Sequence, residues 1–255
     1  MNRIFAPLFL LLIAIFSPLV VAQDLSDVEL LTALDQARFF DSSVTQISIR
    51  IESVTPDETR EAELNLSFLG NEQGSFARIE FVSPPELSGQ IYLSTPDATY
   101  FFGPDLEFPI KTAATTQVFG DSAVAQTSGI RFADSYTISE RRSITREDGT
   151  PALEIDLAAI DFSVAFQEVT VTVDPETLRP LSAILYAVSG IPFYEVFYEE
   201  YAVREDSEDV YAKTQRIVNL LLTGRTTTSE VLDLRTDPLP DSLFDPEQLA
   251  SGGDS

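Results

Sequence analysis

Apolar and polar residues alternate along several short segments of this chain, and this two-residue period constrains the fold more than any other feature. The clearest segments are residues 46–52, 61–68, 152–158 and 168–173. Successive side chains of a β-strand point to opposite faces, so each segment predicts a strand with one buried face. Turn sequences rich in Pro, Gly, Asn and Asp separate the segments, as they separate the strands of an antiparallel sheet.

A helical pattern precedes these strands. Ser26 and Glu29 have the spacing of a capping box, and apolar residues follow at three-residue steps, which predicts one amphipathic helix over residues 26–38. We count about ten or eleven strands and find no alternation of strands with helices. The pattern therefore predicts a mainly β protein with a flanking helix, built as a barrel or a strongly curved antiparallel sheet.

The composition excludes several classes of chemistry. The chain has no Cys, no His and no Trp, and its 41 acidic residues against 16 basic ones give a formal charge of −25. Without imidazole or thiol groups it cannot form a Ser-His-Asp triad, a Cys-His pair, an iron–sulfur cluster or a disulfide. We expect no nucleic acid to bind, because the acidic excess repels phosphate, and contact with an anionic membrane would need a local apolar patch.

The first residues have the pattern of an export signal. Residues 1–22 hold one Arg, an apolar run over residues 4–16 and the small residues Val20 and Ala22 before a cleavage point. The alternative is a membrane anchor, but the run is short for a span of about 20 residues. We therefore expect a signal peptide at 1–22, a single domain at 23–249, a flexible tail at 250–255, and export to the periplasm of a Gram-negative-type bacterium.

Four segments then resemble a known family. They read FVSPPELSGQIYL (81–93), YFFGP (100–104), FPIK (108–111) and PLPDSLFDPEQL (238–249). Their order resembles that of the outer-membrane lipoprotein-sorting proteins, the LolA-like family, in which a short helix follows the last strand. The run FGDS (119–122) is similar to the start of a family segment that contains a fixed Asp, whereas residues 127–131 depart from its end.

This resemblance implies a strongly curved antiparallel sheet forming an incomplete β-barrel, with helices across its mouth and an apolar cavity between them. In that family the cavity shields acyl chains during transit between membranes, and no catalytic group is needed, since each buried CH₂ contributes about 0.8 kcal/mol. The resemblance therefore implies a monomeric, non-enzymatic periplasmic carrier of lipoprotein acyl chains or lipid, with inner- and outer-membrane protein partners and without a metal or cofactor.

The candidate ligand-binding residues are the apolar rows of the central strands. The expected cavity lining comprises Leu64, Leu66, Phe68, Ile79, Phe81, Ile91, Leu93, Tyr100 and Phe102. The irregular segment 108–135 is the expected lid, and its large apolar residues are Phe119, Ile130 and Phe132. An ordinary core that fills the barrel would produce the same rows, so the sequence leaves both interpretations open.

Other interpretations also stay open at this level. A periplasmic sensor of the same fold, which binds a protein partner, is the main alternative, and a hydrolase that uses two carboxylates is a further one. Residues 205–209 could bind Ca²⁺, but they lack the spacing and the Gly of an EF-hand, so a solvated turn is the preferred interpretation. Arg141 and Arg142 could orient an anionic headgroup or pair with neighbouring acids. The aromatic run 193–201 fits either an exposed ladder or a wall of the cavity mouth.

Overall fold

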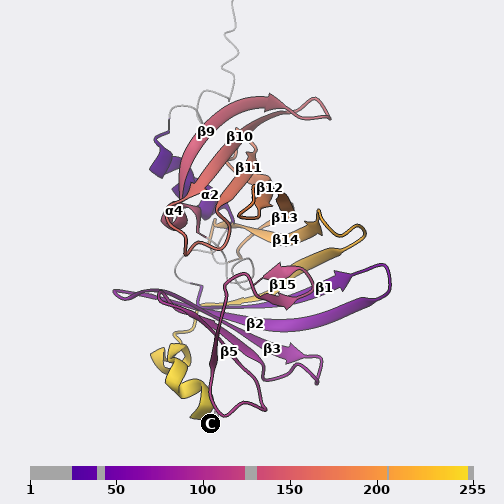
Figure 1. Cartoon of the computed structure of the whole chain (residues 1–255). Coiled ribbons are helices and arrows are strands. Elements are labelled where there is room, and N and C mark those ends of the chain that lie inside the picture. The colour runs from indigo at the N-terminus through magenta and orange to yellow at the C-terminus, as the bar shows by residue number, and fades with distance from the viewer. Residues whose placement is uncertain (1–24, 39–43, 124–130, 206, 252–255) are drawn as a thin grey trace, which may run out of the picture.

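A strongly curved antiparallel sheet forms the body of the protein in the computed structural model, which describes residues 25–38, 44–123, 131–205 and 207–251 (Figure 1). Thirteen strands of the described part of the chain pair in the order β6-β5-β4-β3-β2-β1-β15-β14-β13-β12-β11-β10-β9. Since β6 and β9 stand at opposite ends of this order, the sheet is not closed. The predicted mainly β fold with an incomplete barrel is confirmed.

The first six strands of the chain form one half of the sheet, called here the lower half after its place in Figure 1, and the last of them lies within the segment 108–135 that was expected to be irregular. They are β1 (Gln46–Val54), β2 (Thr59–Asn71), β3 (Gly74–Ser83), β4 (Ile91–Ser94), β5 (Thr99–Phe102) and β6 (Ile110–Thr112). The upper half consists of β9 (Tyr136–Thr145), β10 (Pro151–Ala159), β11 (Glu168–Val173), β12 (Pro180–Tyr186), β13 (Pro192–Val203) and β14 (Val210–Asn219). β15 (Thr226–Arg235) pairs with both β14 and β1 and joins the two halves.

The remaining elements lie against the faces of this sheet. They are α2 (Asp27–Arg38), α4 (Phe132–Ser135), a separate hairpin of β7 (Gln117–Phe119) and β8 (Ser122–Ala123), and the 3₁₀ helices η1 (Asp241–Phe244) and η2 (Pro246–Ser251). α2 begins as predicted: the Ser26 N–H donates to Glu29 at 2.9 Å, and the Glu29 N–H donates back to the Ser26 hydroxyl at 3.4 Å. The hydrogen bonds from Ser26 lower the pKa of Glu29.

The strand register divides the side chains between two faces of the sheet. Across β14, β15 and β1, Ile217 lies opposite Thr227, and Thr227 lies opposite Ser53. Residues directly opposite each other in a sheet share a face, so the apolar rows of both halves continue one another on what we call the inner face. The other side of the sheet is the outer face.

Three groups of buried apolar residues follow from this division. α2 and α4 pack on the inner face of the upper half, and the cover hairpin, residues 117–123, packs on the inner face of the lower half. η1 and η2 pack on the outer face of the lower half, beneath the sheet in Figure 1. The short helix expected after the last strand is therefore present, but it lies behind the sheet.

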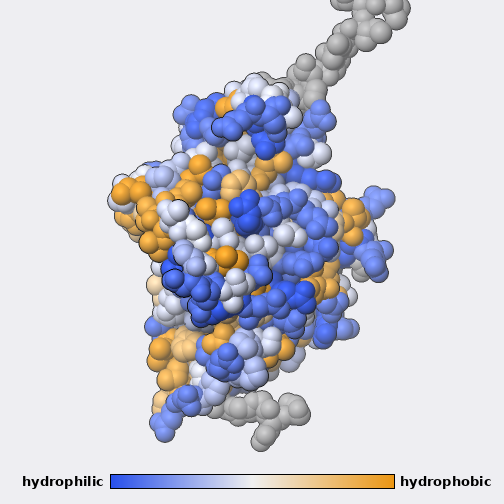
Figure 2. All heavy atoms as spheres, turned by 90° about the vertical axis from the view of Figure 1, so that its right-hand side faces the viewer, coloured by the Kyte–Doolittle hydropathy of each residue, from blue (hydrophilic) through white to orange (hydrophobic). Residues whose placement is uncertain are grey.

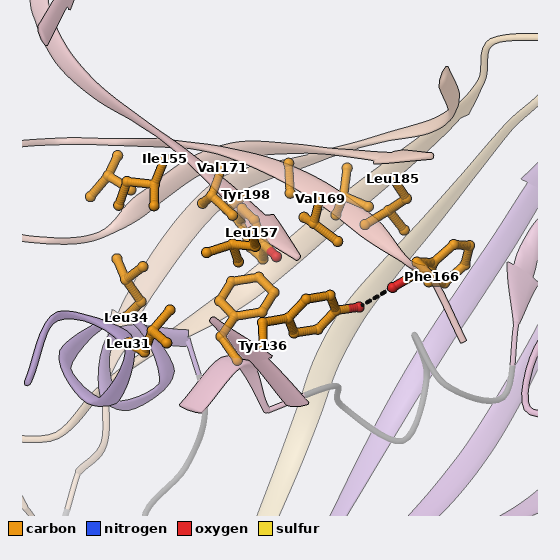
Figure 3. Close-up of a cluster of buried hydrophobic side chains, with 14 of the residues drawn as sticks. Leu31, Leu34, Tyr136, Ile155, Leu157, Phe166, Val169, Val171, Leu185 and Tyr198 are labelled. Carbon is orange, nitrogen blue, oxygen red and sulfur yellow. Dashed lines mark hydrogen bonds between the residues drawn. The ribbon is translucent and has the colours of Figure 1, made fainter. Parts of the chain in front are cut away.

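The upper half has a continuous apolar core (Figure 3). Leu31 and Leu34 of α2 point toward Ile155 and Leu157 of β10, and these side chains are 0–3% exposed. The aromatic run 193–201 contributes Tyr194, Val196 and Tyr198 to the same core. The expectation of an exposed ladder or a cavity mouth is therefore wrong for this face of the run.

The predicted boundaries of the domain remain predictions. The signal peptide at 1–22 lies outside the described residues, as does most of the tail at 250–255. Within the described part of the chain, no helix combines the length and the apolar character that crossing a membrane requires.

Candidate functional site

Five of the nine predicted lining residues lie together on the inner face of the lower half. They are Leu64, Leu66, Phe68, Ile79 and Phe81, and they belong to one buried cluster. β2 and β3 bring them together, because Leu64 pairs with Phe81 and Leu66 with Ile79. Their neighbours on this face are the isoleucines of β1. The result is a continuous apolar surface, which is the candidate binding site.

The other four predicted lining residues lie on the outer face. Ile91, Leu93, Tyr100 and Phe102 pack against η1 and η2, where Phe244 is 3% exposed. The register explains this outcome, since Ile79 of the inner face pairs with Tyr92 rather than with Ile91 or Leu93. The expectation that all nine residues line one cavity is therefore wrong, because β4 and β5 are covered on both faces and have apolar residues on each.

The inner positions of β4 and β5 are occupied by Tyr92 and Phe101. The sequence predicted their neighbours Ile91, Leu93, Tyr100 and Phe102 at these positions. Tyr92 pairs with Phe101, and their ring centroids lie 4.9 Å apart. Burial raises the pKa of Tyr92 above its ordinary value. The sequence contained a signal for them, because residues 91–93 and 100–102 are apolar at every position and so provide a large side chain to both faces.

The cover hairpin closes the candidate site. Phe119 is 5% exposed, and its ring centroid lies 6.4 Å from that of Phe81. On its other side, the Arg60 guanidinium lies 5.2 Å from the centre of the Phe119 ring. Leu64, Leu66, Ile79 and Phe81 are 0–2% exposed. In this conformation they are buried against other parts of the protein.

A buried polar group holds the cover hairpin onto the centre of the sheet. Asp121, at 1% exposure, accepts hydrogen bonds from the Asn219 amide at 2.8 Å and from Arg225 at 3.3 Å, and its own N–H donates to the Thr227 hydroxyl at 2.9 Å. We call Ser53, Asn219 and Thr227, which are 1–4% exposed, the polar seat. The polar seat separates the apolar inner surfaces of the two halves.

Gly120 allows the close contact between the cover hairpin and the polar seat. Its φ is +56°, and a Cβ at this position would lie 2.5 Å from the hydroxyl oxygens of both Ser53 and Thr227. A side chain would therefore force the hairpin off the sheet. Gln117 adds a link to the upper half, donating to the Tyr194 hydroxyl at 3.3 Å. The pKa of Tyr194 is raised, mainly by burial.

A second buried charge fixes the helices of the upper half. Asp35 of α2 accepts hydrogen bonds from the backbone N–H groups of Phe132 and Ala133, both at 2.9 Å, at the start of α4. Arg38 donates to Asp35 at 2.8 Å and lies 3.7 Å from the centre of the Phe132 ring. Although burial acts to lower the pKa of Arg38, contacts that include Asp35 raise it overall.

The three predicted lid residues therefore do not act as one group. Phe119 covers the lower half, Phe132 belongs to the core of the upper half, and Ile130 lies outside the described residues. In that upper core, the Tyr136 hydroxyl donates to the Phe166 carbonyl at 2.9 Å (Figure 3). Burial raises the pKa of Tyr136.

The buried carboxylates, and the two arginines that the sequence singled out, are engaged in structural contacts. Asp35 and Asp121, the buried carboxylates of the described residues, each pair with an arginine in a different cluster. Arg141 pairs with Asp27, and Arg142 with Glu154 and Asp156, so ion pairing accounts for both arginines. Among the described residues, no group of three or more acidic side chains is placed to hold a metal ion.

Comparison with known proteins identifies the fold. A LolA superfamily protein from Nitrosomonas europaea is 22% identical with a TM-score of 0.76, over 87% of this chain and 98% of that one. An outer membrane lipoprotein-sorting protein domain from Vibrio parahaemolyticus is 17% identical with a TM-score of 0.74, over 90% and 99%. A DUF1329 family protein from Desulfovibrio piger is 14% identical with a TM-score of 0.70, over 89% and 97%.

The sequence comparisons add a family. No curated protein matches this chain. A family model described as "Uncharacterized protein" matches residues 75–251, which is more than half of the chain. The matched region runs from β3 to the end of η2 and so includes the cover hairpin, Asn219 and Thr227 of the polar seat, and the whole upper half. The chain belongs to the family of this model, and its fold is that of the LolA-like lipoprotein-sorting proteins.

Proposed function

We propose that this protein is a periplasmic, non-enzymatic carrier that holds the acyl chains of a lipoprotein or lipid against the inner face of its lower half. The observation that supports this most is the nature of the cover. A wide apolar surface is closed by a short separate hairpin, whose large apolar contact is Phe119 and whose attachment is the polar group around Asp121.

The energetics of such a cover favour exchange with a ligand. If the hairpin lifts, water replaces the hydrogen bonds of Asp121 at a net cost of about 0.5–3 kcal/mol each. The exposed apolar surface would cost far more in water, unless an acyl chain takes the place of Phe119. Each CH₂ of that chain that leaves water contributes about 0.8 kcal/mol, so a long acyl chain offsets the loss of the cover.

The positions of the buried charged groups favour a function without catalysis. Within the described part of the chain, the two buried carboxylates are held by Arg38 and Arg225 in separate clusters, which argues against the paired carboxylates of a hydrolase. We therefore infer no enzymatic activity. We also infer that cargo passes from a donor at the inner membrane to an acceptor at the outer membrane, with the protein acting as a monomer.

A sensor of the same fold is the second candidate function, and one observation favours it. Leu64, Leu66, Ile79 and Phe81 on the inner face of the lower half are 0–2% exposed, so the centre of this face is packed in this conformation. A sensor would keep the cover hairpin closed and would bind a protein partner on its surface. A carrier would exchange the cover hairpin for cargo.

Binding of a palmitoylated, fluorescently labelled peptide separates the two functions. Phe68 and Phe102 form a matched pair, since both are partly buried phenylalanines of the lower half, on the inner and the outer face respectively. We expect wild-type protein to bind the peptide, Phe68→Ser to bind it about tenfold more weakly, and Phe102→Ser to bind it as wild type does. Absence of binding, or equal losses in the two variants, would contradict the carrier function.

A further inference from the structure

Large apolar side chains are exposed at three neighbouring turns of the upper half and β15. The turns are residues 160–167 between β10 and β11, 187–191 between β12 and β13, and 220–225 between β14 and β15. Their exposed apolar residues are Ile160, Phe162, Val188, Ile191, Leu220, Leu221 and Leu222. Phe162 is 95% and Val188 is 86% exposed, so these side chains project away from the body of the protein.

The register places the three turns on one edge of the sheet. Glu168, after the first turn, pairs with Tyr186, before the second. Tyr194, after the second turn, pairs with Asn219, before the third. We call residues 160–167, 187–191 and 220–225 the apolar edge. Figure 2 shows hydrophobic residues exposed in separate groups among hydrophilic surface on one face of the molecule.

The opposite edge of the same strands is acidic. Its turns are residues 146–150, 174–179 and 204–209, which contain eight carboxylates and three arginines in the sequence. The apolar edge contains one acid, Asp161, and one base, Arg225, which pairs with Asp121. In these three strand pairs the acidic groups are therefore concentrated at the opposite edge, while the apolar edge is bordered by Glu168 and, beside Gly224, by the turn 55–58 with Asp57 and Glu58.

This separation of charge favours a lipid surface over a protein as the binding partner of the apolar edge. An anionic bilayer repels acidic surfaces within about a Debye length of 8–10 Å, so this protein approaches it most easily through a region with few acids. Apolar side chains at the tips of turns can enter the boundary between headgroups and acyl chains. The core of a protein interface is instead a packed surface rich in Tyr, Trp and Arg, which these three turns do not provide.

The apolar edge is also connected to the cover hairpin. The side-chain oxygen of Asn219 accepts hydrogen bonds from the backbone N–H groups of Leu221 and Leu222, at 3.0 and 2.8 Å. The amide nitrogen of the same side chain donates to Asp121 at 2.8 Å. One residue of the polar seat thus shapes the third turn of the apolar edge and holds the cover hairpin.

We propose that the apolar edge docks this protein onto the surface of a lipid bilayer, with Phe162, Val188 and Leu221 entering the interface. Docking there places the polar seat and the cover hairpin near the membrane, where acyl chains arrive or leave. Binding to a bilayer needs no cargo in the inner face. The proposal goes beyond the carrier function and is tested separately from it.

Flotation with vesicles of phosphatidylethanolamine and phosphatidylglycerol tests the proposal on the exported full chain without cargo. We expect wild type to float with the vesicles and Phe162→Ser/Val188→Ser/Leu221→Ser to bind at least about tenfold more weakly. The control is Val203→Ser/Leu232→Ser, at two positions outside the apolar edge that are 61% and 42% exposed, and it should float as wild type does. Peptide binding by the triple variant should remain unchanged.

A fluorescence measurement locates the contact. Because the chain has no Trp, Phe162→Trp and Val203→Trp each give a protein with a single indole. We expect vesicles to shift the emission of the first to shorter wavelength and brominated lipids to quench it, while the second stays unchanged. The proposal is overturned if wild type does not bind vesicles, or if the triple variant and the control lose binding equally. Cross-linking of position 162 to an envelope protein without vesicle binding would also overturn it.

Discussion

Each half of the sheet has an apolar inner face, and the two halves bury this face in different ways. In the upper half, α2 and α4 cover it with several apolar side chains and fix it with the buried pair Asp35–Arg38. In the lower half, the cover hairpin covers it with Phe119 and is attached at the polar seat. The comparison indicates that the upper half is a permanent core and that the lower half has a cover which can be exchanged.

Breaking the buried ion pair tests the permanent core and should have the largest effect. Asp35→Ala leaves Arg38, which is 6% exposed, without its carboxylate, and leaves the first N–H groups of α4 without their acceptor. We expect a loss of about 3–5 kcal/mol in the free energy of unfolding, measured by chemical denaturation. Asp233→Ala, which removes an ion pair that is more than half exposed, is the control and should unfold as wild type does. Equal stability of the two variants would show that the pair does not fix the helices.

Two matched cavity substitutions compare the halves directly. Leu64 of the lower half and Ile155 of the upper half are both 0% exposed. We expect each change to Ala to lower the free energy of unfolding by about 3 kcal/mol, because each leaves a cavity. Leu64→Ala should also weaken binding of the palmitoylated peptide, whereas Ile155→Ala should leave the dissociation constant of the folded protein unchanged. The comparison fails if Ile155→Ala weakens binding as much as Leu64→Ala does.

Loosening the cover hairpin should separate stability from binding. Asp121→Ala removes the acceptor for Asn219 and Arg225, so we expect a loss of about 1–3 kcal/mol in the free energy of unfolding. The peptide should nevertheless associate faster, since the cover opens more readily, and stopped-flow fluorescence measures this rate. Asp97→Ala, at an exposed turn position of the lower half, should change neither quantity. A slower association in Asp121→Ala would mean that the hairpin is part of the binding surface and does not act as a cover.

The smallest expected effect concerns a partly buried acid on the outer face of the upper half. Burial raises the pKa of Glu195, and Arg216 opposes this in part. A raised carboxyl pKa in the folded state means that folding favours the protonated form. Stability is therefore lost as pH rises from the unfolded pKa, about 4.3, through the folded one. Glu195→Gln should melt slightly above wild type at pH 7 and at the same temperature below about pH 4. A lower melting temperature at pH 7 would contradict this assignment.

The alternation of residues predicted the strands and the incomplete barrel because it reports which side chains of one strand share a face. It could not relate one strand to the next. Leu64 and Leu93 show the same alternation, but the loop and register between β3 and β4 place them on opposite faces. For this reason the prediction that Ile91, Leu93, Tyr100 and Phe102 lie on the inner face is wrong.

The sequence predicted the cover hairpin and its attachment to the polar seat only in part. The irregular segment 108–135 indicated a lid, and the resemblance pointed to the run that contains Phe119 and Asp121. Nothing local to Asn219 or Thr227 indicated that they would meet Asp121, because 98 and 106 residues separate them along the chain. Contacts between distant polar residues depend on the completed sheet, which residue patterns do not specify.

The central claim is that an acyl chain replaces the cover hairpin on the inner face, and a single tryptophan measures this most directly. In Phe119→Trp the indole would be the one Trp of the chain, with Phe244→Trp, at the end of η1 on the outer face, as the control. We predict that the palmitoylated peptide shifts the emission of the first to longer wavelength, with saturation at one peptide per protein, and leaves the second unchanged. Saturating peptide binding with no change in the emission at position 119 would contradict the account.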